Sequence, residues 1–188
     1  MENHKDAIKI AGEMFDIPPE VLGAIFVKEI YTRVLPDFTA NVLSAYGDMY
    51  VPIQMGPIKK VFGQHTVGPG AISPENTNKA WDYTFNTNHH LSRRATTDLQ
   101  VRLAQDVEYN ILSTAAILNW YIENDIQQSR EGIKRAHFVE GRPISQYSTD
   151  EIKLLYWYYN TGGQLNPERK RYGDYTYEYI PWVRELLK

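Results

Sequence analysis

Apolar residues recur at three- and four-residue intervals near the N-terminus, which predicts two helices. In residues 4–15 they fall on one helical face and stop before the sequence DIPPE. Pro18-Pro19 suits the first turn of a second helix, which we expect to run to about Arg33. The apolar positions of the first helix are Ala7, Ile8, Ala11, Met14 and Phe15.

The middle of the chain, residues 34–98, carries no long helical or strand period. Short helical turns are expected at 38–46, 57–63 and 74–83. The stretch DMYVPIQM is compatible with one short strand, which Pro52 would confine to a sheet edge or a loop. A connection this long inside a compact domain is usually functional.

Helical periodicity returns at Asp98 and is strongest there, so we expect one amphipathic helix of about six turns. A short helix is expected at 129–136, and another begins at Ser148 or Thr149, with Glu151 in a capping box, and ends at Gly162-Gly163. The last helix, about 175–187, contains Pro181, which should kink or restart it. The apolar residues of the long helix are Leu99, Leu103, Val107, Ile111, Leu112, Ala115, Leu118 and Ile122.

These elements predict an all-α protein with at most a very small β element. The length of 188 residues favours one domain over 1–188 and a full hydrophobic core. The chain has no cysteine, which excludes disulfides and zinc–thiolate sites. No HExxH, GxSxG or P-loop pattern occurs, so we expect no metal site and no cofactor.

Charge and hydropathy limit the classes of partner that the chain can be expected to bind. The net charge is −3, which gives no global positive field for nucleic acid. Basic clusters at Arg130/Lys134/Arg135 and at Arg169-Lys170-Arg171 are expected to be solvated surface. No run approaches the ~18 apolar residues of a membrane span. No signal peptide is visible, so a protein acting outside the cytoplasm would need another export route.

One carboxylate, Glu29, stands out in the nearly apolar stretch VLGAIFVKEIYTR. Helical phase places it on the stripe of Leu22, Ile25 and Phe26. Desolvation there would raise the pKa of the carboxyl above about 4.3, so that it could hold a proton and act as a general acid in glycosidic cleavage. The alternative is a surface carboxylate that pairs with Lys28 or Arg33.

Three further stretches follow Glu29 along the chain, in the order TVGPGAISPENTNKA, VEYNILSTAAILNWYI and LLYWYYNTGG. This order resembles the lytic transglycosylase and goose-type lysozyme group of the lysozyme-like superfamily. The resemblance implies a lysozyme-like fold with a long central helix and a substrate cleft, and Glu29 as the catalytic acid. It implies a cleft lining formed by Gly68, Gly70, Ala71 and Ile72, together with the stretch of Pro74 and Thr77 that follows them. It also matches Asn110-Ile111 to the central helix and Tyr159-Asn160-Thr161-Gly162 to the motif that closes the site.

The chain departs from the family pattern in three places. Ile30 stands where the family commonly has Ser, and Ala71 stands where it usually has Gln, which removes a side-chain donor to the sugar. About forty residues separate Glu29 from Gly68, which implies an insertion at 34–66 on one cleft wall. These differences affect the subfamily and the sugar contacts more than the reaction class.

Two routes use the same acid. In an inverting hydrolase a second carboxylate activates water, and the candidates here are Asp37 and Asp48, which could equally be turn or cap residues. In the lyase route that the resemblance implies, Glu29 donates and then removes a proton, and a 1,6-anhydro product forms without a second carboxylate. Tyr159 and Asn160 are expected at the sugar, with the Tyr159 hydroxyl near Glu29, although a buried core role explains Tyr159 as well.

The sequence therefore predicts cleavage of the β-1,4 MurNAc–GlcNAc bond of peptidoglycan. The expected partner is the glycan strand, and the absence of a visible leader suggests a phage-type lysin or a secreted antibacterial effector that acts in the periplasm or on the cell wall. A delivery or immunity protein is then a further partner, by analogy. The alternatives are a non-catalytic wall- or partner-binding module on the same fold, and a chitin-type substrate.

Overall fold

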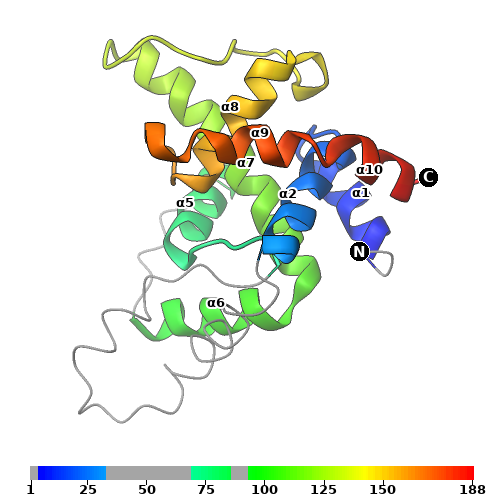
Figure 1. Cartoon of the computed structure of the whole chain (residues 1–188). Coiled ribbons are helices and arrows are strands. Elements are labelled where there is room, and N and C mark those ends of the chain that lie inside the picture. Colours follow the sequence, from blue (N-terminus) through cyan, green and yellow to red (C-terminus); the bar gives the residue numbers. More distant parts are fainter. Residues whose placement is uncertain (1–3, 33–68, 86–92) are drawn as a thin grey trace.

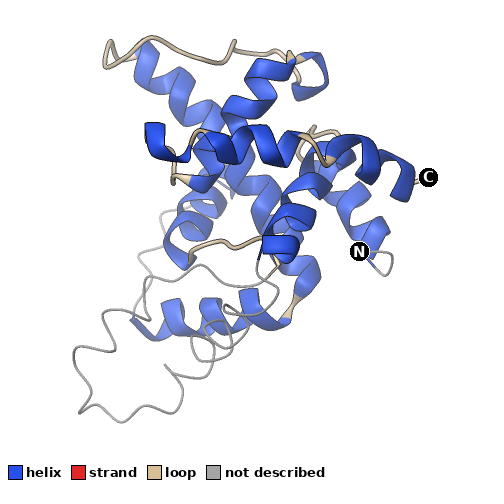
Figure 2. Ribbon diagram, viewed as in Figure 1, coloured by secondary structure: helices blue, strands red, loops and turns tan. Residues whose placement is uncertain are grey.

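The computed structural model describes residues 4–32, 69–85 and 93–188, and within these ranges the regular elements are helices, with no strand (Figure 2). The predicted all-α fold is confirmed. None of the described helices combines the length and the apolar character needed to cross a membrane. The predicted turns at 38–46 and 57–63, the strand DMYVPIQM and the insertion at 34–66 lie outside the described residues.

Helix α7, Val107–Arg130, runs through the middle of the molecule (Figure 1). It contacts α1 (Lys5–Met14), α5 (Pro74–Phe85), α6 (Arg93–Gln105) and α8 (Thr149–Asn160). All six residues from Ser113 to Leu118 are buried, so the middle of the helix is covered on every side, whereas Glu108, Gln127 and Arg130 nearer its ends are exposed. A stretch buried all round belongs to the core, whereas the sequence predicted an amphipathic helix throughout.

The single long helix predicted from Asp98 is in fact two helices. Helix α6 ends at Gln105 and α7 begins at Val107, because Asp106 adopts an extended conformation (φ −102°, ψ 95°). Its carboxylate accepts the backbone N–H of Tyr109 at 2.9 Å, an N-cap that favours a new helix start over continuation of the old one. The predicted short helix at 129–136 is also wrong, because α7 extends to Arg130 and Gly132 follows in the left-handed region (φ 72°).

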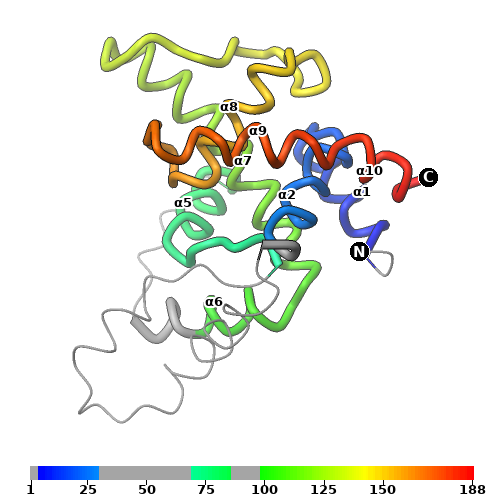
Figure 3. The backbone as a smooth tube through the Cα atoms, in the orientation of Figure 1, coloured from blue at the N-terminus to red at the C-terminus, as the bar shows by residue number. Residues whose placement is uncertain are grey.

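Helix α2, Pro19–Thr32, begins at the predicted proline and packs against α1, α9 (Arg171–Tyr177) and α10 (Ile180–Leu186). Figure 3 shows these first and last helices side by side. The Tyr156 hydroxyl donates to the Val21 carbonyl at 2.9 Å. An ion pair between Glu20 and Arg184 adds a weaker link at the surface. The two ends of the chain therefore hold α2 in place.

The segment from Ser148 onward follows the sequence prediction closely. Ser148 and Glu151 form the expected capping box at the start of α8. The helix ends at Asn160, and Gly162 and Gly163 take positive φ values of 65° and 84°. After the short 3₁₀ helix η3 (Pro167–Arg169), α9 and α10 form with Pro181 in the first turn of α10. The predicted restart is confirmed, although the helical part begins at Arg171 rather than at 175.

A buried carboxylate fixes the loop between α7 and α8, which also contains the 3₁₀ helix η2 (Ile144–Gln146). Asp125 accepts the backbone N–H groups of His137 at 2.7 Å and Phe138 at 3.2 Å, and the Tyr158 hydroxyl at 2.8 Å. Its ion pair with Lys134 measures 2.7 Å. Burial alone would raise the pKa of Asp125, but these hydrogen bonds outweigh it and lower the pKa. Lys134 is thus part of the interior network, whereas the sequence placed it on solvated surface.

Candidate active site

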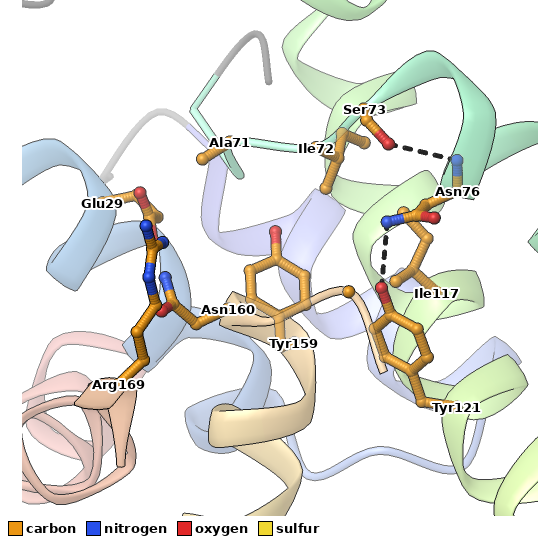
Figure 4. A pocket seen from close by; sticks show the side chains of 11 residues that line it. Glu29, Ala71, Ile72, Ser73, Asn76, Ile117, Tyr121, Tyr159, Asn160 and Arg169 are labelled. Atoms are coloured by element: carbon orange, nitrogen blue, oxygen red, sulfur yellow. Dashed lines mark hydrogen bonds between the residues drawn. The ribbon is translucent and has the colours of Figure 1, made fainter. Parts of the chain in front are cut away.

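A cavity of about 340 Å³ opens where α2, α5, α7, α8 and η3 meet (Figure 4). Its wall combines one carboxylate, one guanidinium, two phenols, amides and apolar side chains. Clefts of this size, with a few polar groups among apolar ones, are typical of ligand sites. The lining residues are Glu29, Ala71, Ile72, Ser73, Asn76, Ile117, Tyr121, Tyr159, Asn160, Gly162 and Arg169.

Glu29 lies in the last turn of α2 and is only 7% exposed, yet it lines the cavity. The surface position considered for it is therefore wrong, and Arg33, one of the partners considered, lies outside the described residues. Residues Val21 to Val27 are all buried, so α2 is apolar on every side and not only along one stripe. Both this apolar setting and the negative end of the helix dipole favour the neutral acid over the carboxylate.

A second group acts on Glu29 in the opposite direction. The Tyr172 hydroxyl, at the start of α9, donates a hydrogen bond to the Glu29 carboxylate. Burial, together with the neighbouring Glu29 and Tyr159, raises the pKa of Tyr172 well above its ordinary value, so the phenol stays protonated and remains a donor. Donation to the charged form stabilises that form. The acid is therefore held between an environment that favours its proton and a donor that favours its anion.

The turn at Gly70-Ala71 forms the wall beside Glu29 and is held from two sides. Asn110 accepts the Gly70 N–H at 2.8 Å, and the Tyr159 hydroxyl donates to the Gly70 carbonyl. An added Cβ at Gly70 would lie 2.3 Å from the Thr114 hydroxyl, so only glycine fits. Ala71 has φ 55°, a left-handed conformation that is strained for an L-residue, and the two hydrogen bonds at Gly70 offset this strain.

The opposite wall comes from α5 and α7. The Asn76 side-chain amide donates to the Tyr121 hydroxyl at 3.0 Å, and the Asn76 backbone N–H donates to the Ser73 hydroxyl at 3.2 Å (Figure 4). Burial raises the pKa of Tyr121, which therefore stays a neutral phenol. Gly163 packs against the Tyr121 ring, 3.1 Å from the position of an added Cβ. This wall is neutral and rich in hydrogen-bonding groups.

The sequence-predicted residues meet only in part. Glu29, Ala71, Ile72, Tyr159 and Asn160 line one cavity as expected. Gly70 lies behind this wall and shapes it without lining it. Asp37, Asp48 and Gly68 fall outside the described residues. Tyr159 lines the same cavity as Glu29, and its hydroxyl donates to the Gly70 carbonyl; a second phenol, that of Tyr172, donates to Glu29.

Sequence reasoning missed Tyr172, Tyr121, Asn76 and Arg169. Asn76 stands inside the quoted stretch ISPENT, between Pro74 and Thr77, which was a usable signal. The Thr77 side chain is fully buried and bonds the Ser73 carbonyl at 2.9 Å, so it supports the wall. No local pattern marks Tyr172, because its contact with Glu29 spans 143 residues.

Arg169 is the cation of the cavity. The basic run Arg169-Lys170-Arg171 is exposed, as predicted, and the Arg169 side chain in addition extends from η3 toward Glu29 and lines the cavity (Figure 4). The turn that carries it is fixed: Trp157 donates its indole N–H to the Asn166 carbonyl at 2.8 Å, and the Asn166 side chain accepts the Glu168 N–H at 3.0 Å. Arginine therefore stands on a rigid support at the cavity wall.

Metal chemistry finds no support in the part of the chain that the structure describes, where no group of three or more His, Asp or Glu side chains is placed to hold an ion. Comparisons of the chain with models of known protein families, with curated proteins and with solved structures found no match. The site must therefore be interpreted from its own geometry.

Proposed function

We propose that this protein cleaves the β-1,4 MurNAc–GlcNAc bond of peptidoglycan, with Glu29 as the general acid. The observation that carries the proposal is the position of Glu29, which is buried at 7% exposure yet borders a cavity of about 340 Å³. A general acid for glycosidic cleavage needs both an apolar setting that retains the proton and access to the leaving oxygen. The resemblance to the lysozyme-like superfamily supports the same role.

The remaining cavity groups suit an N-acetylated sugar. Tyr159 and Tyr121 offer aromatic surface, and Asn160 and Asn76 offer amide donors and acceptors. Ring faces and a few fixed polar groups are what a sugar with apolar C–H faces and an acetamido group requires. Gly70 and Asn110 hold the Ala71-Ile72 wall at a fixed distance from them. Binding in this cavity would bring the glycosidic oxygen to Glu29.

Of the two routes we propose the lyase route, which the resemblance implies and which needs no carboxylate besides Glu29. Among the described residues that line the cavity, Glu29 is the only carboxylate. In this route the acid first protonates the leaving oxygen, and the same carboxylate then removes the proton of the 6-hydroxyl group as that oxygen closes on C1. The Tyr172 hydrogen bond holds in place the carboxylate that the first half leaves and that acts as the base of the second half.

The test is a digest of purified peptidoglycan with the wild type and Glu29→Gln. The wild type should release muropeptides with 1,6-anhydro ends, and the variant should lose about 10²–10⁴-fold in rate while its thermal unfolding stays close to the wild type. Glu20→Gln is the matched control on the same helix, since Glu20 forms only the surface ion pair with Arg184, and it should keep full activity. Reducing ends in place of anhydro ends would indicate hydrolysis, and Asp37→Asn and Asp48→Asn would then identify the second carboxylate.

A non-catalytic wall- or partner-binding module is the second candidate. Ala71 brings no side-chain donor to the cavity, and the Tyr172 hydrogen bond works against a protonated Glu29. A wild type that binds cell walls without cutting them would establish this alternative. If the enzyme is delivered to another cell's wall, a bacterial producer would need an immunity protein that covers the cavity, and the enzyme would act in the periplasm or on the cell wall.

A further inference from the structure

We propose that Arg169 forms an anion subsite beside Glu29, which binds a carboxylate carried by the muramyl sugar of the strand. This inference rests on the proposed function and adds the group that the cavity recognises next to the scissile bond. It assigns a role to a basic residue that the sequence alone placed on solvated surface.

The first argument is the placement of Arg169. All three residues of the basic run are exposed, but only Arg169 lines the same cavity as Glu29 and points toward it, while Lys170 and Arg171 lie outside the lining. A guanidinium there is suited to bind a planar anion with two parallel N–H donors.

The second argument is that Arg169 keeps its charge available. Within the described ranges it forms no ion pair, whereas Arg130, Arg142 and Arg184 each pair with a glutamate. Its helical turn is nevertheless fixed by the Trp157–Asn166 hydrogen bond. The backbone that carries this cation is therefore held before a ligand binds, so that little backbone ordering remains to be done on binding.

The third argument is the chemistry of the strand. A chitin-type glycan is neutral, whereas N-acetylmuramic acid carries a lactyl group on the sugar that flanks the cleaved bond. In peptide-free strands this group ends in a free carboxylate. In intact peptidoglycan it is an amide, and the nearest carboxylates belong to the stem peptide. The shared chemistry is a carboxylate on the muramyl residue, and the two sources can be separated by substrate preparation.

The experiment measures binding with the Glu29→Gln protein, which should hold strands without cutting them. Labelled peptide-free strands are titrated by fluorescence polarisation, alongside the same strands with their carboxylates converted to methylamides, and alongside soluble strands that retain stem peptides. Adding Arg169→Gln should weaken binding of the peptide-free strands about 10- to 100-fold, the usual effect of losing a charge-assisted contact. The methylamide strands should bind weakly to both proteins.

Lys170→Gln is the matched control, because it removes the same charge one residue away from the cavity. It should change affinity less than about threefold, the size of a weak long-range charge effect at ordinary ionic strength. Arg169→Lys should be intermediate, because it keeps the charge and loses the paired donors. Equal losses for Arg169→Gln and Lys170→Gln would mean a general basic surface and would overturn the subsite.

The outcomes separate this inference from the proposed function. A preference for peptide-free strands assigns the lactyl carboxylate and means that an amidase must act first on the wall. A preference for strands with stem peptides that is lost in Arg169→Gln assigns a stem-peptide carboxylate. Binding that is indifferent to methylamide conversion and to Arg169→Gln overturns the inference, even if the wild type cuts the wall. Carboxylate-dependent binding by a wild type that does not cut supports the subsite and removes the enzymatic proposal.

Discussion

Asn110 should contribute more to stability than any other polar residue near the cavity wall, and Asn110→Ala tests this. Its side chain is fully buried and joins two segments, accepting the Gly70 N–H at 2.8 Å and donating to the Leu103 carbonyl at 3.0 Å. Truncation leaves both backbone groups buried without these partners, at about 1–3 kcal/mol each. We therefore expect a loss of about 4 kcal/mol in the free energy of unfolding.

The assay is urea unfolding followed by circular dichroism, with thermal unfolding in parallel. For a chain of this size each kcal/mol corresponds to about 2–4 °C, so the melting temperature should fall by roughly 8–16 °C. Asn119→Ala is the control on the same helix, because Asn119 is partly exposed and makes no side-chain hydrogen bond within the described residues. It should stay within about 0.5 kcal/mol of the wild type.

Asn110→Asp sharpens the test. It keeps an oxygen for the Gly70 N–H but turns a second oxygen toward the Leu103 carbonyl, unless the carboxyl is protonated and can donate. The folded state then binds the proton more tightly than the unfolded state. The variant should be closest to the wild type below about pH 4 and lose stability as the pH rises. An Asn110→Ala protein within 1 kcal/mol of the wild type, or an Asp variant indifferent to pH, would refute the role given to Asn110.

Three further predictions follow from named contacts. Tyr172→Phe removes a donor to the Glu29 carboxylate, so the pH above which the digest slows should move upward, and an unchanged pH profile would contradict the contact. Asp125→Asn should cost about 3 kcal/mol at pH 7. Because the folded pKa of Asp125 is lowered, the wild type should lose this stability as the pH falls below about 4, and the difference between the two proteins should shrink there. Ser148→Ala breaks the capping box with Glu151 and should cost about 1 kcal/mol in urea unfolding, with activity unchanged at 25 °C; a neutral effect would show that the cap adds nothing.

The helices could be predicted wherever the sequence carried a local signal. Pro19 at a first turn, the Ser148–Glu151 capping box and Pro181 at a restart each act within a few residues, and each marks a helix end in the structure. Asp106 was not recognised as a helix boundary, because the apolar period continues across it although its side chain caps a new helix. Periodicity indicates which residues are buried, and two helices joined at a cap can bury apolar residues whose spacing continues unbroken from one helix to the next.

Only those residues of the candidate site that belong to motifs in a recognisable order along the chain could be predicted. Glu29, Ala71-Ile72 and Tyr159-Asn160 were chosen because their motifs succeed one another as in a known group, and they do line one cavity. Tyr172 and Arg169 belong to no such motif, and they reach Glu29's surroundings only through the packing of η3 and α9 on α8 and α2. Contacts between residues far apart in the sequence produce no regular spacing, so the sequence pattern does not predict them.

The hydrogen bond between Glu29 and Tyr172 joins an early part of the chain to a late one. A ribosome makes Glu29 first and its phenolic partner 143 residues later, so a growing chain holds the acid long before it can complete the pocket around it. A protease that removed η3 and α9 would strip the same donor and the same wall from a finished molecule. Completion of the site therefore waits for the segment from Pro167 to Tyr177, although the acid itself is made early.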